Sequence, residues 1–132
     1  MDKIDKLREF VKKEFSNCHM REFENKFVIA LNLFGIDCFD GTAMSIELLD
    51  DGRYKLSDCH SSIDSLEERM VDISDYKDEL ERIKSHFYKT ALEQDGNVFE
   101  MTVPTDNENY LSRYIGYMTQ FMSLVMNIDC LK

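Results

Sequence analysis

The first pattern of polar and apolar residues along the chain predicts a helix. Over residues 2–17, apolar side chains recur at steps of three and four positions, and Lys and Glu fill many of the positions between them. This spacing is typical of an amphipathic helix, and Asp2 stands where its N-cap is expected. Residues 26–34 then form a nearly continuous apolar run rich in Phe, Val, Ile and Leu, which predicts a buried strand.

Alternating apolar and polar residues on either side of a turn predict a hairpin. The alternation runs over residues 44–48 and returns over residues 54–56, with Asp50-Asp51-Gly52 between the two segments. An Asp-Gly pair readily adopts the positive backbone angles that tight hairpins need. Together with the strand over residues 26–34, this hairpin predicts a three-stranded antiparallel meander.

Helical spacing returns after the meander. Residues 61–70 and 74–87 each carry apolar side chains on one face, which predicts two short helices. Ser74 is the expected cap of the second helix. Alternation over residues 90–103, interrupted by Asp95-Gly96, predicts a second hairpin.

The last segment has the clearest helical pattern. Thr105-Asp106-Asn107-Glu108 fits a capping box, and an apolar stripe runs from Leu111 to Val125. We therefore expect a single α+β domain over residues 1–132. Its predicted order is an N-terminal helix, a three-stranded antiparallel meander, two short helices, a hairpin and a long C-terminal helix.

Length and composition agree with one folded domain outside the membrane. The chain has 132 residues, of which 43% are apolar, enough to form a real core. No apolar run reaches the roughly 20 residues that a membrane span needs, and the first residues lack the apolar core of a signal peptide. The four cysteines lie far apart without a CxxC pair, so we expect free thiols and a cytoplasmic protein.

Charge is the most informative bulk property. The formal net charge is −10, and residues 40–81 hold thirteen acidic side chains against four basic ones. Such a concentration of negative charge repels nucleic acid and anionic membranes and attracts basic protein surfaces. We therefore expect no direct contact with nucleic acid or membrane, and a basic protein as partner.

Several local strings resemble a known family. The string Gly52-Arg53-Tyr54-Lys55-Leu56-Ser57-Asp58 closes the predicted meander, and Ile73-Ser74 links the two short helices. Over residues 27–129 these strings and the order of elements resemble the phage and prophage family called domain of unknown function 1828. The resemblance implies a phage or prophage origin and carries no established activity. Family members commonly have an acid and a glycine where this chain has Cys59-His60.

Metal and nucleophile motifs are weak in this sequence. Cys18-His19 and Cys59-His60 place two ligand types side by side, but adjacent residues seldom chelate one zinc ion well. The chain has no G-x-S-x-G string and no glycine-rich phosphate loop. We therefore assign no catalytic residue, no metal ligand and no cofactor.

The strongest enzymatic alternative is a degenerate metal-dependent nuclease of the restriction-endonuclease type. A helix followed by a meander, a helix and a strand is also the core order of those enzymes, which need acids on two strands and a nearby lysine. Glu47 and Asp50 are the available acids and Lys55 is the available lysine, but Arg53 stands where a metal ligand is needed. We interpret Asp50 as a turn residue and Lys55 as a solvated strand residue.

The carboxylates of the middle segment have two interpretations. They form either a solvated face that keeps a small protein soluble or a surface that imitates the charge of nucleic acid. Two tyrosines lie off the apolar stripe of the last helix and are further interface candidates. The candidate partner-binding residues are Asp64, Glu67, Glu68, Asp72, Asp75, Asp78, Glu79, Glu81, Tyr110 and Tyr117.

These observations lead to one main hypothesis and two alternatives. The main hypothesis is a non-enzymatic, phage-encoded protein of the host cell cytosol that blocks a basic nucleic-acid-binding surface of a host defence protein. An inhibitor of a CRISPR effector is its most concrete form. The alternatives are the degenerate nuclease and a dimeric regulatory or scaffold subunit built on the last helix.

Overall fold

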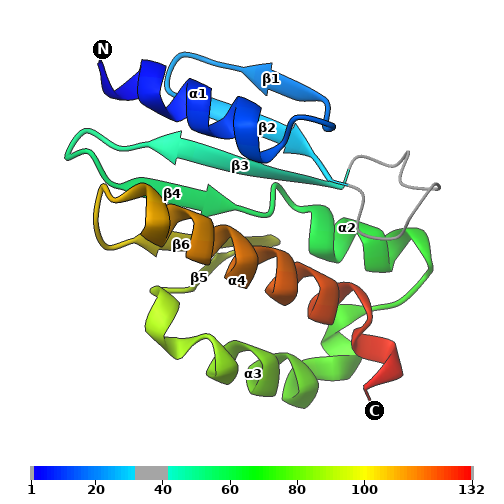
Figure 1. Ribbon diagram of the computed structural model, residues 1–132. Helices are drawn as coiled ribbons and strands as arrows, with labels where there is room; N and C mark the ends of the chain where they lie inside the picture. Colours follow the sequence, from blue (N-terminus) through cyan, green and yellow to red (C-terminus); the bar gives the residue numbers. More distant parts are fainter. Residues whose placement is uncertain (1, 32–41, 132) are drawn as a thin grey trace.

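The computed structural model of the chain describes residues 2–31 and 42–131. Within these residues, six strands form one antiparallel sheet in the order β1-β2-β3-β4-β6-β5 (Figure 1). The elements in chain order are α1 (Lys3–Glu14), β1 (Met20–Glu22), β2 (Lys26–Ala30), β3 (Ala43–Leu48), β4 (Tyr54–Ser57), α2 (Ser61–Glu68), the 3₁₀ turn η1 (Ile73–Tyr76), α3 (Lys77–His86), η2 (Tyr88–Thr90), β5 (Glu93–Asp95), β6 (Val98–Val103), α4 (Glu108–Met126) and η3 (Ile128–Cys130).

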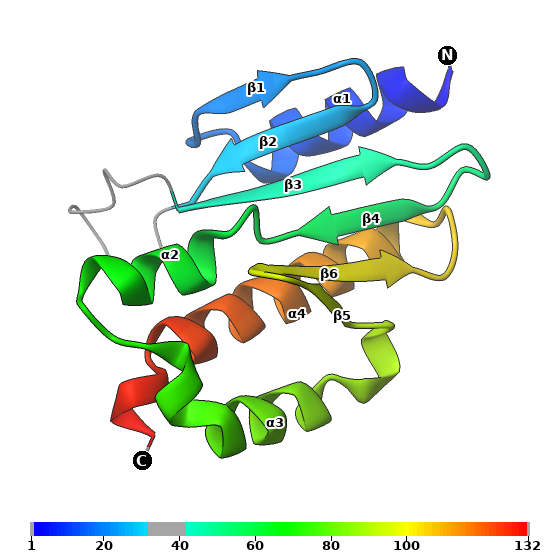
Figure 2. The ribbon, with the colours of Figure 1, turned by 180° about the vertical axis from the view of Figure 1, so that it is seen from behind.

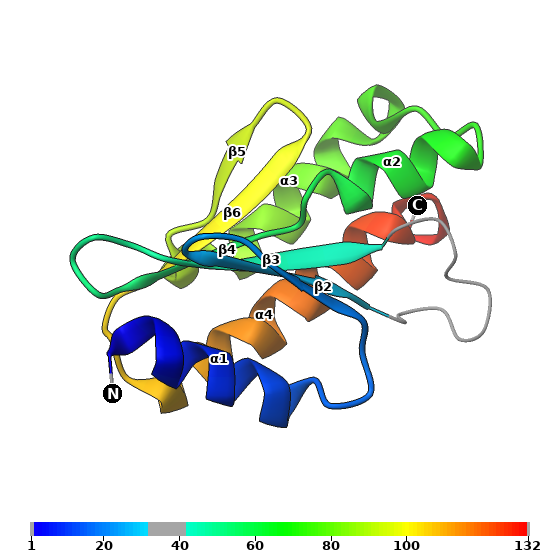
Figure 3. The same cartoon turned by 90° about the horizontal axis from the view of Figure 1, so that it is seen from above.

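The helices are distributed unevenly over the sheet. Helices α1 and α4 cover one face, and the view from behind shows strands β1 to β4 without a described helix across their other face (Figure 2). The view from above places α1 and α4 on the same side of the strands (Figure 3). Helix α2 follows β4 beyond the end of the sheet and packs against α4, and α3 lies beside α4.

The alternation of residues along the strands explains this arrangement. Phe27 and Ile46 are opposite each other in the β2–β3 register, fully buried on the face that α1 and α4 cover. Their neighbours Lys26 and Glu47 are also paired in that register, on the other face, and are only partly buried. Successive side chains of a strand point to opposite faces, so one face joins the core and the other stays accessible to water.

An aromatic cluster connects the sheet to the helices. Phe121 of α4 is fully buried, and its ring centroid lies 4.8 Å from that of Phe99 in β6. On its other side lies Phe87, which follows α3, with the two centroids 5.5 Å apart and the rings nearly perpendicular. Edge-to-face pairs of this kind stabilise a core beyond the area they bury. Phe121 therefore joins the sheet, α3 and α4.

The predicted fold class is confirmed. The structure is α+β with the expected N-terminal helix, meander, short helices, hairpin and long C-terminal helix. Asp2 caps α1 by accepting a hydrogen bond of 3.0 Å from the backbone N–H of Asp5. At the β3–β4 hairpin Gly52 has φ +89°, the positive angle for which its lack of a side chain suits it.

Three local predictions need correction. Strand β1 was not predicted, because it has only three residues and its pattern is polar apart from Met20. Asp72, rather than Ser74, caps the turn before α3, because its carboxylate accepts the backbone N–H of Ser74 at 2.9 Å. Likewise Asn107, and not Thr105, caps α4 by accepting from the N–H of Asn109 at 2.7 Å.

Both cap corrections have one physical cause. Asp and Asn side chains bond readily to the backbone N–H two residues ahead, so Asp72 and Asn107 cap the turns that begin directly after them. The last residues of the strand predicted over 26–34 lie outside the described residues, as do Cys38 and Asp40.

Candidate functional site

The corner between β4 and α2 positions the acidic segment. Asp58 is completely buried there, and its Oδ1 accepts hydrogen bonds from the backbone N–H groups of Phe99 at 3.0 Å and His60 at 3.2 Å. Its own N–H donates to the carbonyl oxygen of Phe99 at 3.0 Å. Asp58 thus fixes the start of α2 against β6. It belongs to the interior, so it does not add to the exposed negative charge that the sequence count attributed to its segment.

The backbone of this corner is unusual. Cys59 and His60 follow Asp58 with φ of +52° and +67°, a region that side-chain-bearing residues occupy rarely. Burial raises the pKa of the Asp58 carboxyl, against the opposing influence of the Phe99 N–H and the Ser62 hydroxyl. Asp58 Oδ2 and Ser62 Oγ are both buried. Among the described residues, neither atom has a partner at the distance and angle of an ordinary hydrogen bond.

Helix α2 separates apolar from acidic residues by its periodicity. Ile63 and Leu66 are buried against the core. Asp64 and Glu68 lie on the side of the helix away from these residues, Glu67 flanks the apolar stripe, and all three are exposed. The same separation holds in α3, where Leu80 and Ile83 are buried while Asp78 and Glu81 are exposed. We call the exposed carboxylates of these elements the acidic surface: Asp64, Glu67, Glu68, Asp72, Asp75, Asp78 and Glu81.

Most of the acidic surface is not neutralised by neighbours. Ion pairs join Glu81 to Lys84 at 3.3 Å and Glu79 to Arg82 at 3.7 Å. The Glu79 side chain is only 12% exposed, so this predicted site residue contributes little to the surface. Across residues 2–31 and 42–131, no ion pair involves Asp64, Glu67, Asp72, Asp75 or Asp78. The Ser74 hydroxyl and N–H lower the pKa of Asp72, so its carboxylate keeps its charge.

An exposed methionine lies directly after α2. Met70 is 95% exposed and has φ +62°. The N–H of Met70 donates to the carbonyl of Glu67, and the N–H of Val71 donates to that of Leu66 at 2.8 Å. This is the Schellman pattern of a helix end, in which glycine is the usual residue at the position of Met70. The helical spacing over residues 61–70 predicted Met70 on the apolar face with Ile63 and Leu66, and this prediction was wrong because α2 ends at Glu68, before that position.

Arg69 anchors this region to the end of α4. Its guanidinium group donates to the backbone carbonyl of Met126 and forms an ion pair of 3.2 Å with Asp129. The hydrogen bonds from Arg69 lower the pKa of Asp129. Helix α2 and the end of α4 are therefore held together, and α2 and the start of α3, which carry these carboxylates, lie toward the same end of the molecule as the end of α4 (Figure 1).

The structure does not bring the two candidate tyrosines together with the acidic surface as one patch. Tyr110 lies in the first turn of α4, the end away from α2, and is 39% exposed beside Arg113 (Figure 1). Tyr117 is half-buried and packs against the ring of Tyr114, with centroids 5.5 Å apart. Tyr110 therefore belongs to a different part of the surface from the carboxylates.

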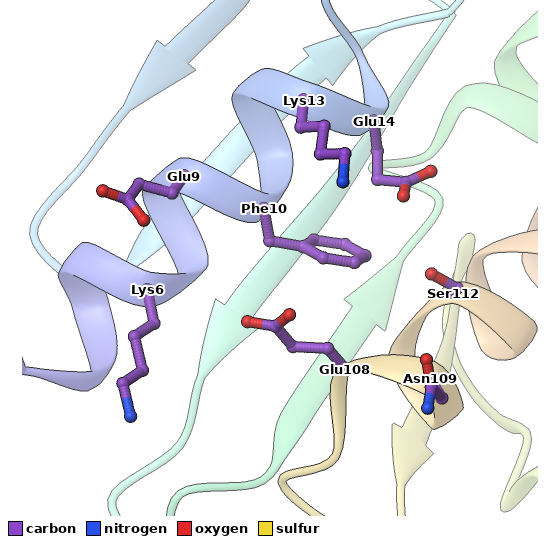
Figure 4. A pocket seen from close by; sticks show the side chains of 8 residues that line it. All are labelled: Lys6, Glu9, Phe10, Lys13, Glu14, Glu108, Asn109 and Ser112. Carbon is purple, nitrogen blue, oxygen red and sulfur yellow. The ribbon is translucent and has the colours of Figure 1, made fainter.

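Two grooves flank α4 and were not predicted. One lies between α1 and α4 and has a volume of about 320 Å³; Phe10 points toward its centre and charged side chains of both signs surround it (Figure 4). The other lies between α3 and the end of α4, with a similar volume of about 320 Å³. It is lined by Glu79, Arg82, Ile83, His86, Leu124 and Leu131. No local sequence signal indicates either groove, because each forms between segments far apart in the chain.

The residues of the nuclease alternative come together only in part. Glu47 lies opposite Lys55 in the β3–β4 register, and Lys55 lies 3.8 Å from Glu100 as an ion pair. All three side chains line one pocket of about 310 Å³. Asp50 is an exposed residue of the turn. The neighbouring Asp51 accepts hydrogen bonds from Arg53.

Among the described residues, the side chains that could bind a metal ion also do not cluster. Over residues 2–31 and 42–131, no three His, Cys, Asp or Glu side chains come close enough to hold a metal ion. Cys18, Cys59 and Cys130 are free thiols, and burial raises the pKa of Cys59.

Comparison of the chain with protein-family models, with curated proteins and with solved structures gives no match. Among the described residues, no helix has both the length and the apolar character needed to cross a membrane. The arrangement of side chains is therefore the basis for a functional assignment.

Proposed function

We propose that this protein is a non-enzymatic binding protein that uses its acidic surface to occupy a basic, nucleic-acid-binding groove of another protein. The observation that supports it most directly is the set of five exposed carboxylates, on α2, η1 and the start of α3, without an ion-pair partner in the described chain. Negative charges held together on short helices attract the same Lys and Arg side chains that bind phosphates.

The position of two carboxylates favours a binding role over simple solubility. Glu67 and Glu68 lie in the last turn of α2, which contains no basic residue. The C-terminal end of a helix carries partial negative charge, so acids there reduce helix stability by a few tenths of a kcal/mol up to about 1 kcal/mol. Solubility would be served equally well by acids elsewhere, whereas a basic partner at this end of α2 would offset the unfavourable position of these two carboxylates.

The proposed partner is a host defence protein that grips nucleic acid, with a CRISPR effector as the most concrete case. This part of the proposal relies on the resemblance to phage and prophage proteins, because a phage gains from blocking such proteins in the host cell cytosol. Binding through the acidic surface would exclude DNA or RNA from the same groove. The net charge of −10 accords with a decoy that does not itself bind nucleic acid.

A charge-matched pair of variants tests the proposal. The neutral-acid variant carries Asp64→Asn, Glu67→Gln, Asp75→Asn and Asp78→Asn. The control variant carries Glu9→Gln, Glu14→Gln, Glu24→Gln and Glu93→Gln, four exposed acids on other elements. Both lose four negative charges, so only the location of the charge differs.

The assay measures target-DNA cleavage by a guide-loaded CRISPR effector in the presence of each protein, together with pull-down at rising salt. We expect the wild-type and control proteins to inhibit cleavage and the neutral-acid variant to inhibit at least ten-fold less. Complexes should dissociate near roughly 0.5 M salt, because screening shortens the reach of exposed charges. Failure of the wild-type protein to inhibit, or equal loss in both variants, would contradict the proposal.

A further inference from the structure

The groove between α3 and the end of α4 is apolar inside and charged at its rim. Ile83 of α3 and Leu124 of α4 supply apolar walls, and Leu131 adds a side chain that is 46% exposed. Glu79, Arg82 and His86 of α3 form the rim. A volume of about 320 Å³ accepts one or two large apolar side chains of a partner.

Helix α3 connects this groove to the acidic surface. Asp78 lies on the exposed face of α3, and the next residue, Glu79, lines the groove. Asp75 lies in η1, two residues before α3 begins, and is exposed. Helix α3 therefore borders an apolar groove on one side and carries on another the carboxylate of Asp78, which has no ion pair among the described residues.

We infer that this groove binds the apolar face of a basic amphipathic helix of the partner protein, while the partner's Lys and Arg side chains meet the acidic surface. The inference rests on the proposed function and adds the form of the partner segment. Exposed charges mainly guide association, whereas apolar side chains inserted into a groove supply most of the affinity. A protein that binds its partner through carboxylates needs an apolar anchoring site beside them, and the α3–α4 groove lies next to Asp78.

The charge distribution selects this occupant over others. A second copy of the chain would bring a molecule with ten excess negative charges against the same acidic elements, which disfavours self-association at this face. Nucleic acid is repelled for the same reason. An amphipathic helix with leucines on one face and lysines on the other satisfies both the groove and the carboxylates.

A designed peptide serves as the probe. It has 18 residues, with Leu at helical spacing on one face and Lys at the other positions, and a control peptide has the same composition in an order without an apolar face. Affinity is measured by fluorescence anisotropy at 0.15 M salt. We expect the amphipathic peptide to bind at least ten-fold more tightly than its control.

Two matched substitutions locate the binding site. Leu131→Gln removes an exposed apolar side chain of the groove, and Phe23→Gln removes one of similar exposure, 49%, outside it. Both leave the charge unchanged and alter exposed side chains, so both proteins should fold. Leu131→Gln should weaken binding of the amphipathic peptide at least five-fold, and Phe23→Gln should leave it unchanged.

The outcomes separate the two proposals. If the neutral-acid variant loses binding while Leu131→Gln and the reordered peptide make no difference, the groove inference is wrong and the proposed function stands. If Leu131→Gln weakens binding but a peptide with Glu in place of Lys binds equally well, the basic character assigned to the partner is wrong. A dimer of the chain that Leu131→Gln disperses, seen by light scattering, would also overturn the inference.

Discussion

The backbone N–H of Phe99 donates a hydrogen bond of 3.0 Å to the carboxylate of Asp58, although 41 residues separate the two in the chain. The same carboxylate oxygen accepts the N–H of His60, at the point where the chain turns into α2. One buried side chain thus holds β6 and the start of α2 in a fixed relation. The position of the acidic surface depends on this contact, because α2 carries the first of its carboxylates.

Two substitutions of Asp58 distinguish the contribution of its hydrogen bonds to stability from that of its charge. Asp58→Asn keeps an oxygen that accepts from Phe99 and His60, and its new N–H₂ group can donate to the buried Ser62 hydroxyl. Asp58→Ala removes the acceptor and leaves buried N–H groups unpaired, which costs about 1–3 kcal/mol of unfolding free energy. We expect urea titrations to show near wild-type stability for Asp58→Asn and clear destabilisation for Asp58→Ala.

The Asp58 carboxyl should also make stability depend on pH. Burial raises its pKa in the folded protein above the usual 3.8, so the folded state holds this proton more tightly than the unfolded chain. Stability attributable to this group is therefore highest below the unfolded pKa and falls as pH rises through the folded pKa. As pH rises from 3.5, the free energy of unfolding of the wild type should therefore fall relative to that of Asp58→Asn. A constant difference would contradict the raised pKa.

Met70→Gly should stabilise the protein. Met70 has a left-handed backbone conformation, φ +62°, which is strained for a residue with a side chain but not for glycine. Because the Met70 side chain is exposed, removing it loses little packing. We expect a gain of about 0.5–1 kcal/mol in urea unfolding. Met70→Ala keeps the strain and is the control, with stability close to wild type. A destabilised glycine variant would show that the Met70 side chain packs in a way the fold needs.

Phe121 should be among the most sensitive positions of the core. Its ring contacts Phe99 and Phe87, so Phe121→Ala opens a cavity where β6, α3 and α4 meet. A loss of about 3–5 kcal/mol is expected for Phe121→Ala, against a smaller loss for Phe121→Leu, which fills more of the space. Thermal and urea unfolding measure both. Equal losses would indicate that the edge-to-face geometry, rather than the volume, is what stabilises the cluster.

Local signals allowed most of the fold to be predicted from the sequence. The β3–β4 hairpin follows from its Asp-Gly turn, and α4 follows from an apolar stripe that continues over about four turns. The exposure of Asp64 and Glu68 likewise follows from their position away from Ile63 and Leu66 on one helix. Each of these features depends on residues close together in the chain.

The features that escaped prediction depend on distant contacts. Asp58 is one acid among many in the sequence, and only its bond to Phe99 distinguishes it as buried. The groove between α3 and α4 needs the packing of Ile83 against a segment about forty residues later. Strand β1 forms because β2 offers it a partner, although its own residues have little strand character.

The nuclease alternative predicts cleavage where the proposed function predicts none. Purified protein incubated with supercoiled plasmid and Mg²⁺ or Mn²⁺ should leave the plasmid intact, because Asp50 belongs to the exposed turn and no three ligand-type side chains of the described residues lie close enough to hold a metal ion. A catalytic metal site of this type would need both acids beside the lysine, whereas Glu47 lines one pocket with Lys55 and Glu100 and Asp50 does not. Glu47→Ala distinguishes a contaminating nuclease from the protein itself. Cleavage by the wild type that this substitution abolishes would replace the binding role with an enzymatic one.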